Sequence, residues 1–165
     1  MKALVVYESL WGNTAAVARA IAEGVGEGAR ALPTSEATPE LLAEADLVVA
    51  GAPILGFNLP TEAMRKSIAA DPKYRANPPD MSHPSMREWL ERLPRRSVAF
   101  ATFETRIWWS PGSSAKKIAE VFDAAGYRRV AEPERFMVTG SYGPLKDGEI
   151  ERARVWGEQL ARATT

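Results

Sequence analysis

Residues 4–14 read Leu-Val-Val-Tyr-Glu-Ser-Leu-Trp-Gly-Asn-Thr, and this stretch decides the fold. The run from Ala3 to Tyr7 is too short for a helix and rich in β-branched residues, which predicts a buried strand. After Thr14 the apolar residues recur at helical spacing. The loop between them therefore occupies a strand-to-helix turn. Free backbone N–H groups and the positive end of the helix dipole favour an anion such as a phosphate there.

Strand and helix patterns alternate along the rest of the chain. We expect further strands near residues 30–33, 47–50, 97–101 and 136–139, and helices capped by Thr38, Ser85, Ser113 or Ser114, and Asp147. Five strands interleaved with helices predict an α/β sandwich around a parallel sheet. Ligands of such sheets bind beyond the carboxyl ends of the strands. The loops that begin at Glu8, Ala52 and Thr102 are therefore expected to meet at one edge.

Residues 71–84 depart from this alternation. They contain Pro72, Pro78, Pro79 and Pro84 among polar residues, so they cannot form regular structure for long. We expect an excursion or flap within a single domain that spans residues 1–165.

Composition excludes several classes of protein. The chain has no cysteine, which excludes disulfides, thiolate catalysis and cysteine metal sites. Lys plus Arg and Asp plus Glu both number 21, so the net charge of zero gives no overall attraction to nucleic acid or anionic lipid. No apolar run resembles a signal peptide or a membrane span. We expect a soluble, cytoplasmic protein that binds neither nucleic acid nor membranes.

Other tempting motifs fail on their context. Residues 24–29 fit a G-x-G-x-x-A pattern, but they follow a helix and precede a strand, the reverse of a dinucleotide-binding motif. His83 is the only histidine, so no metal site is expected around it. A phosphate-accepting receiver domain needs clustered acids, but the middle strand runs into residues 51–53, Gly-Ala-Pro, and Glu8 stands alone.

Residues 7–14, Tyr-Glu-Ser-Leu-Trp-Gly-Asn-Thr, resemble the phosphate-binding loop of the flavodoxin family. The order of strands and helices extends the resemblance over essentially the whole chain. The resemblance implies a five-stranded sheet in the order 2-1-3-4-5 and FMN as the cofactor. It also implies that the FMN phosphate binds to Ser9, Leu10, Trp11, Gly12, Asn13 and Thr14. At Trp11 the family usually has a second Ser or Thr.

The resemblance also implies that two later loops hold the flavin ring. The first loop is apolar where exposed loops are normally polar, and contributes Pro53, Ile54, Leu55, Gly56 and Phe57. The second contributes Thr102, Phe103, Glu104, Thr105, Trp108 and Trp109. From the residues alone, the apolar loop could instead fill the rim of the core. The two Trp residues could stack on the ring, form an exposed partner patch or anchor the core.

Three functions stay open. The first is an FMN-binding electron-transfer protein with a redox partner protein, in which flavin N5 carries the chemistry and neither a catalytic side chain nor a metal is expected. The second is an FMN-dependent NAD(P)H:quinone-type oxidoreductase that also takes a small oxidant. The third is an interaction module without flavin. Lys116 and Lys117 form a solvated helix face or guide an anionic partner. The oligomeric state is not predicted.

Overall fold

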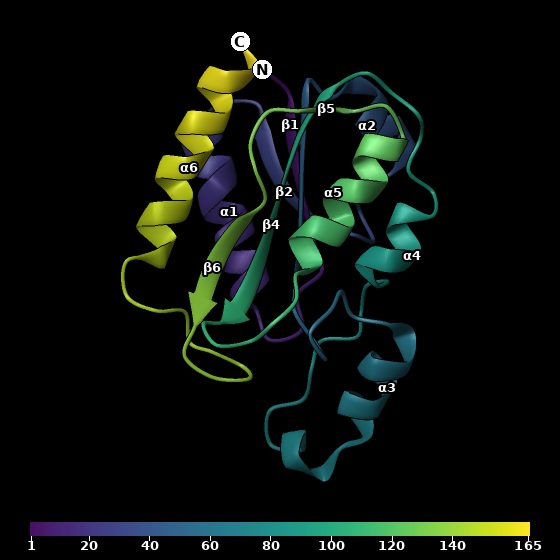
Figure 1. Ribbon diagram of the computed structural model, residues 1–165, viewed down its shortest axis with the longest axis vertical. Coiled ribbons are helices and arrows are strands. Elements are labelled where there is room, and N and C mark those ends of the chain that lie inside the picture. Colours follow the sequence, from purple (N-terminus) through teal and green to yellow (C-terminus); the bar gives the residue numbers. More distant parts are fainter.

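A computed structural model describes residues 1–165, and its strands form one parallel sheet (Figure 1). The strands are β1 (Ala3–Tyr7), β2 (Ala29–Pro33), β3 (Leu47–Pro53), β4 (Ala99–Ile107), β5 (Arg128–Arg129) and β6 (Glu134–Val138). Their order is β2-β1-β3-β4, and both β5 and β6 pair with β4. Because β5 and β6 share the fifth position, the predicted order 2-1-3-4-5 is confirmed.

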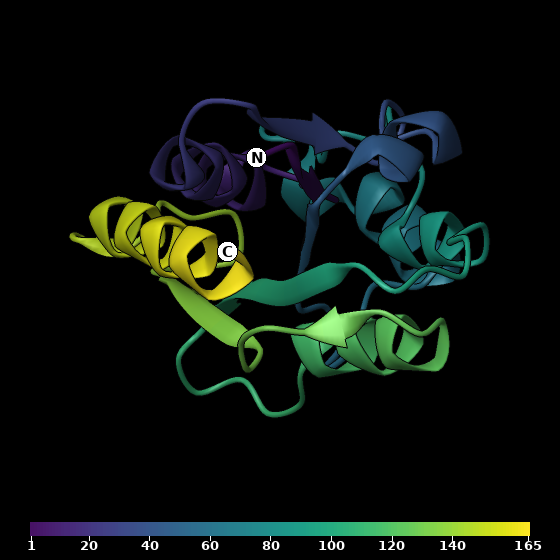
Figure 2. The same ribbon diagram turned by 90° about the horizontal axis from the view of Figure 1, so that it is seen from above.

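Helices cover both faces of the sheet, as Figure 2 shows from above. The helices α1 (Asn13–Val25) and α6 (Glu149–Thr164) lie side by side on one face. The helices α2 (Pro39–Glu44), α4 (Met86–Leu90) and α5 (Ser114–Ala124) pack on the other. Side-chain oxygens of Thr38, Ser85 and Ser113 cap these last three helices, as their sequences predict.

The core consists of two hydrophobic clusters, one on each face of the sheet. Val48 of β3 belongs to the cluster that includes Phe100 and Phe122, whereas the next residue, Val49, belongs to the cluster that includes Trp156. Successive side chains of a strand point to opposite faces, so a central parallel strand is apolar throughout. This explains why the central strands appear in the sequence as continuous apolar runs.

Two strands extend further than their sequences predict. Residues Gly51–Pro53 continue β3 because they pair with Phe103, Glu104 and Thr105 of β4. On its other side β4 pairs with β6 over Phe103–Ile107. Neighbours on both sides therefore hold β4 in the sheet as far as Ile107, and the prediction that a loop begins at Thr102 is wrong.

Two smaller features also differ from the prediction. The cap of α6 is Gly148, at a φ of 85°, rather than Asp147. A glycine takes this left-handed conformation without strain, so the chain turns into the helix one residue later than expected. The strand β5 was not predicted, because its two exposed arginines carry no apolar pattern.

One segment extends beyond the sheet edge at which the parallel strands end (Figure 1). This lobe, residues 61–84, begins with Thr61 as the cap of α3 (Glu62–Ala70) and continues through a single 3₁₀ turn, η1 (Pro72–Tyr74). The rest of the predicted excursion is irregular, as its prolines require. No helix in the chain is long and apolar enough to span a membrane.

Candidate functional site

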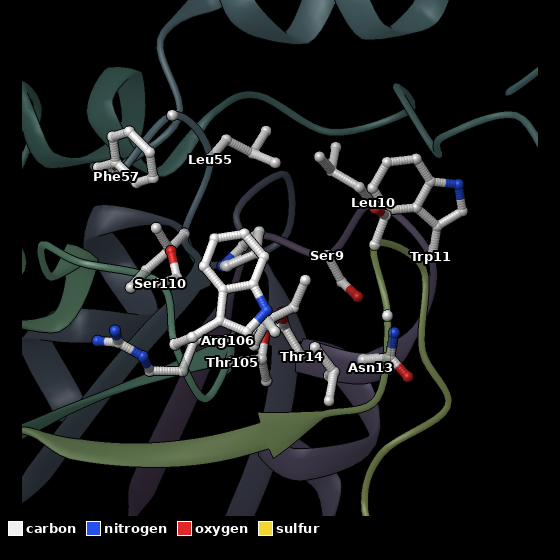
Figure 3. Close-up of a pocket in the computed structure, with 18 of the residues that line it drawn as sticks. Ser9, Leu10, Trp11, Asn13, Thr14, Leu55, Phe57, Thr105, Arg106 and Ser110 are labelled. Carbon is white, nitrogen blue, oxygen red and sulfur yellow. The ribbon is translucent and has the colours of Figure 1, made fainter. Parts of the chain in front are cut away.

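A cavity of about 220 Å³ lies at the carboxyl ends of the strands (Figure 3). It brings together most of the predicted cofactor-binding residues: Ser9, Leu10, Trp11, Asn13, Thr14, Pro53, Ile54, Leu55, Gly56, Phe57, Thr105 and Trp109. Other predicted residues do not line it: Gly12, Thr102, Phe103, Glu104 and Trp108. Residues that were not assigned to the site complete the lining: Tyr74, Arg106, Ile107, Ser110, Val138, Gly140 and Ser141.

The loop between β1 and α1 is folded around the Ser9 hydroxyl. Ser9 Oγ accepts hydrogen bonds from the backbone N–H groups of Gly12, at 3.1 Å, and Ala15, at 3.2 Å. Gly12 is the N-cap of α1 and has a φ of 90°, a left-handed conformation that permits this tight turn. Since both acceptor positions of the hydroxyl are used, its O–H remains available to donate.

Four backbone N–H groups of this loop have no acceptor within the protein. They belong to Leu10, Trp11, Asn13 and Thr14. Each of these residues lines the cavity, whose lining contains no carboxylate. Unpaired amides at the start of a helix, together with one free hydroxyl proton, are the donors that a phosphate requires. The loop Ser9–Thr14 therefore fits a phosphate group.

The Trp11 side chain turns away from this cluster of donors and lies at the rim of the cavity (Figure 3). Its Nε1 donates to Asn77 O at 2.9 Å. Its ring lies 5.1 Å from that of Tyr74 and 6.1 Å from that of Tyr142, between ring centroids. Trp11 thus leaves space for an anion and joins the phosphate-binding loop to the lobe.

The apolar loop after β3 is a two-residue hairpin turn. Leu55 and Asn58 exchange backbone hydrogen bonds of 2.9 and 3.0 Å around Gly56 and Phe57, whose φ angles are 54° and 67°. Positive φ at both central residues is typical of a type I′ turn, and it is strained for phenylalanine. The turn leaves the Phe57 side chain 57% exposed beside the cavity. The interpretation that it fills the core rim is wrong for Phe57.

The end of β4 contributes less to the cavity than predicted. Thr102, Phe103 and Glu104 are buried inside the sheet because β4 continues past them. Thr105 is the first residue of this strand to line the cavity, and its hydroxyl lies 2.8 Å from that of Thr14.

Glu104 instead braces the loop that follows β4. Its Oε1 accepts from the Ala115 N–H at 3.1 Å and from the Ser113 hydroxyl, and its Oε2 accepts from Arg106 Nη1 at 2.9 Å. Arg106 Nη1 also donates to Gly112 O at 2.9 Å, and the guanidinium points away from the cavity (Figure 3). A Cβ on Gly112 would lie 1.8 Å from Phe57 O. The two loops flanking the cavity therefore meet at Gly112.

Trp108 and Trp109 are exposed by 69% and 60%, so the interpretation of both as core anchors is wrong. Trp109 lines the cavity, whereas Trp108 does not. Lys116 and Lys117 are also exposed, on the first turn of α5.

A buried polar network lies behind the phosphate-binding loop, and sequence reasoning missed it. Ser9 N–H donates to His83 Nε2 at 3.0 Å, and Arg65 Nη2 donates to His83 O at 2.6 Å. Glu8 Oε1 accepts from Met86 N–H at 2.8 Å, and Glu8 Oε2 lies 3.3 Å from Arg65 Nε. The only signal in the sequence was the single histidine, His83, within the polar, proline-rich excursion.

Burial controls the charge of this network. Glu8 is fully buried, and the cost of desolvating its carboxylate raises its pKa to about 7. Burial also lowers the pKa of His83 below its ordinary value, which favours the neutral imidazole. No group of three or more His, Cys, Asp or Glu residues is placed to hold a metal ion.

Comparison with known proteins identifies the family. The flavodoxin family model matches residues 5–156. The chain belongs to the flavodoxin family. Members of this family bind FMN, and the free donors of the loop Ser9–Thr14 fit the phosphate of this cofactor. No curated protein sequence matches the chain.

Solved structures share the flavodoxin fold with this chain. A flavodoxin from the domain Archaea is 21% identical with a TM-score of 0.69, and 99% of each chain is covered. Flavodoxin 1 from Bacillus cereus is 15% identical with a TM-score of 0.68, and 98% of each chain is covered. Rubredoxin oxygen:oxidoreductase from Desulfovibrio gigas is 18% identical with a TM-score of 0.62, over 99% of this chain and 36% of that one.

Proposed function

We propose that this chain is an FMN-dependent electron carrier that exchanges electrons with a protein partner at the mouth of the cavity. The phosphate of FMN binds to the loop Ser9–Thr14, and its ring lies between the turn at residues 55–58 and the loop that carries Trp109. When bound, FMN supplies the electron transfer. The protein's own residues hold the phosphate, cover the ring and leave one edge accessible.

The observation that carries this proposal is the exposed aromatic rim of the cavity. Phe57 and Trp109 line the cavity and are 57% and 60% exposed, and the neighbouring Trp108 is 69% exposed. Large apolar side chains grouped at one place on a surface are typical of sites that contact another molecule. We therefore propose that these side chains contact both the edge of the flavin ring and the partner protein.

The test begins with flavin binding. Apo-protein incubated with FMN should remain yellow after the unbound flavin is removed by gel filtration, and titration should saturate at one FMN per chain by quenching of flavin fluorescence. The expected signal includes perturbed flavin absorption bands, because the ring leaves water for an apolar slot. Protein that is colourless after incubation with excess FMN and removal of the unbound flavin contradicts the proposal and leaves the interaction module as the function.

One observation favours a second candidate, an FMN-dependent NAD(P)H:quinone-type oxidoreductase. Tyr74 of the lobe lines the cavity, and its ring lies 5.1 Å from that of Trp11, between ring centroids, which gives the site an additional aromatic wall. A planar oxidant could stack there. Anaerobic mixing of the FMN-loaded protein with NADPH separates the two functions. Bleaching of the flavin within seconds supports the oxidoreductase, whereas no bleaching supports a carrier that needs a protein donor.

A further inference from the structure

We infer that His83 is a positioning residue for the phosphate-binding loop, which it holds through the hydrogen bond between its Nε2 atom and the Ser9 N–H. The inference rests on the proposed function, because it concerns how Ser9–Thr14 is held ready for the FMN phosphate. His83 does not line the main cavity, so it acts through Ser9 and not by touching the cofactor.

The position of Ser9 in the sheet explains why a side chain is needed there. In a parallel ladder alternate residues donate to the same neighbour. Ala3 N–H donates to Gly28 O, next to the start of β2. Ser9 follows Ala3 by an even number of residues, so its N–H faces the same side as that of Ala3. However, β2 ends at Pro33, opposite Tyr7. The next residue, Thr34, still donates its N–H to Tyr7 O at 3.1 Å, but no backbone carbonyl accepts from Ser9 N–H. His83 Nε2 takes the place of the missing strand carbonyl at 3.0 Å.

The structure fixes His83 in the form that this role requires. Because Nε2 accepts a hydrogen bond, the proton of the neutral ring must be on Nδ1, which lies 4.0 Å from Asp80 Oδ2. Arg65 Nη2 holds the main chain of His83 at its carbonyl, at 2.6 Å. The next carbonyl, that of Pro84, accepts from the Thr34 hydroxyl at 2.7 Å. The main chain is therefore held at His83 and at the following residue, and His83 is 5% exposed.

The hydrogen bond matters for the anion site because Ser9 organises the rest of the loop. With its N–H held from behind, Ser9 keeps its Oγ where the N–H groups of Gly12 and Ala15 reach it. This leaves the hydroxyl proton and the amides of the loop free for phosphate. Without an acceptor at His83, the buried Ser9 N–H would lose its partner, and rotation of that peptide would disturb the whole set of donors.

The test compares two flavins that differ only in the phosphate. FMN and riboflavin are titrated by fluorescence quenching into the wild type, H83L and H83Q. Leucine removes the acceptor, whereas the glutamine carbonyl can replace Nε2. We expect H83L to weaken FMN binding about tenfold with riboflavin binding unchanged, and H83Q to restore most of the loss. M81Q, at an exposed position of the same segment, should bind both flavins as the wild type does.

Each outcome has a distinct meaning. Unchanged FMN affinity in H83L, an equal loss for both flavins, or no rescue by H83Q would overturn the inference. Failure of the wild type to bind FMN defeats the proposed function instead.

A measurement on the wild type keeps the inference testable if H83L does not fold. As the chain has one histidine, its ¹⁵N imidazole resonances are unambiguous. We expect an unprotonated Nε2 at neutral pH that shifts on addition of FMN but not of riboflavin. A protonated Nε2, or an equal response to both flavins, overturns the inference.

Discussion

The two ends of the cavity are built differently. The phosphate end, Ser9–Thr14, is supported from behind by one buried hydrogen bond to His83 and within the loop by the Ser9 hydroxyl. The ring end consists of two loops that present exposed aromatic side chains and touch each other where Gly112 meets Phe57. One end is fixed before any ligand arrives, whereas the other keeps apolar surface in contact with water.

This difference separates the two tasks of the site. Preorganised donors lose little conformational freedom on binding, so the phosphate end is expected to supply affinity for FMN over riboflavin. Exposed aromatics at the ring end are expected to adjust to the flavin and to a partner. Substitutions at the phosphate end should therefore weaken the binding of FMN alone, whereas substitutions at the ring end should weaken the binding of FMN and riboflavin alike.

The largest effect is expected at the contact between the two ring loops. In G112A the new methyl group would collide with Phe57 O, and the left-handed φ of 83° would be strained. We expect the free energy of unfolding to fall by about 3 kcal/mol, and both flavins to bind more weakly. Urea unfolding and flavin titration measure the two effects. G148A is the matched control, since Gly148 has a φ of 85° but open space around it; an equal loss in both variants would refute the contact.

The next largest effect is expected from a substitution that disturbs only the phosphate end. S9A removes the acceptor of two backbone N–H groups and the free hydroxyl proton. We expect FMN to bind roughly fiftyfold more weakly, about 2.3 kcal/mol, with riboflavin binding unchanged. S110A removes a hydroxyl from the ring end of the same cavity and should leave the preference for FMN intact. Riboflavin binding that weakens as much as FMN binding in S9A would contradict this division of tasks.

The pH dependence of the free energy of unfolding should also distinguish the two ends, because only the phosphate end packs against a buried carboxyl group with a strongly raised pKa. Folding raises the pKa of Glu8 to about 7, so the folded state binds more protons than the unfolded state between the two pKa values. This contribution therefore favours the folded state at low pH and is lost as the pH rises towards 7.

E8Q removes this dependence on pH. Relative to E8Q, the wild type should lose about 2 kcal/mol of unfolding free energy between pH 5 and pH 7. Urea unfolding of both proteins at the two pH values measures the difference, and the other titrating groups are common to both. Parallel pH profiles would show that Glu8 titrates normally.

The smallest effect concerns the two neighbouring tryptophans. Trp109 lines the cavity and Trp108 does not, although both are exposed. W109A should weaken FMN and riboflavin equally, by about fivefold or 1 kcal/mol, because it removes aromatic contact with the ring. W108A should leave both affinities unchanged. A selective loss of FMN binding in W109A would place this side chain at the wrong end of the cavity.

Local sequence patterns were sufficient to predict where most strands and helices lie along the chain. The apolar runs around Val5 and Val49 and the capping residues Thr38 and Ser85 act within a few residues, so these elements follow from them, whereas the order of the strands in the sheet followed from the family resemblance. The strand ends do not follow in this way. Thr102–Glu104 were assigned to a loop because the pairing of β4 with both β3 and β6 is a tertiary effect.

The site was predictable where one loop forms it and unpredictable where distant segments meet. Ser9, Asn13 and Thr14 share one short motif, and the structure gathers them in one cavity. Tyr74 and His83 come from an irregular segment whose path depends on prolines and on contacts with Trp11 and Arg65. No local pattern in the sequence specifies such contacts.

Two of the contacts that attach the lobe to the phosphate-binding loop use the main chain of the lobe. Asn77 O accepts from Trp11 Nε1, and Asp80 N–H donates to Leu10 O at 2.6 Å. Main-chain partners are retained when outward side chains such as Lys73 and Arg75 are replaced. The outer surface of the lobe is thus free to drift during evolution while the flavin site behind it stays intact. Replacement of Lys73 or Arg75 in this chain is therefore expected to leave the cofactor site unchanged.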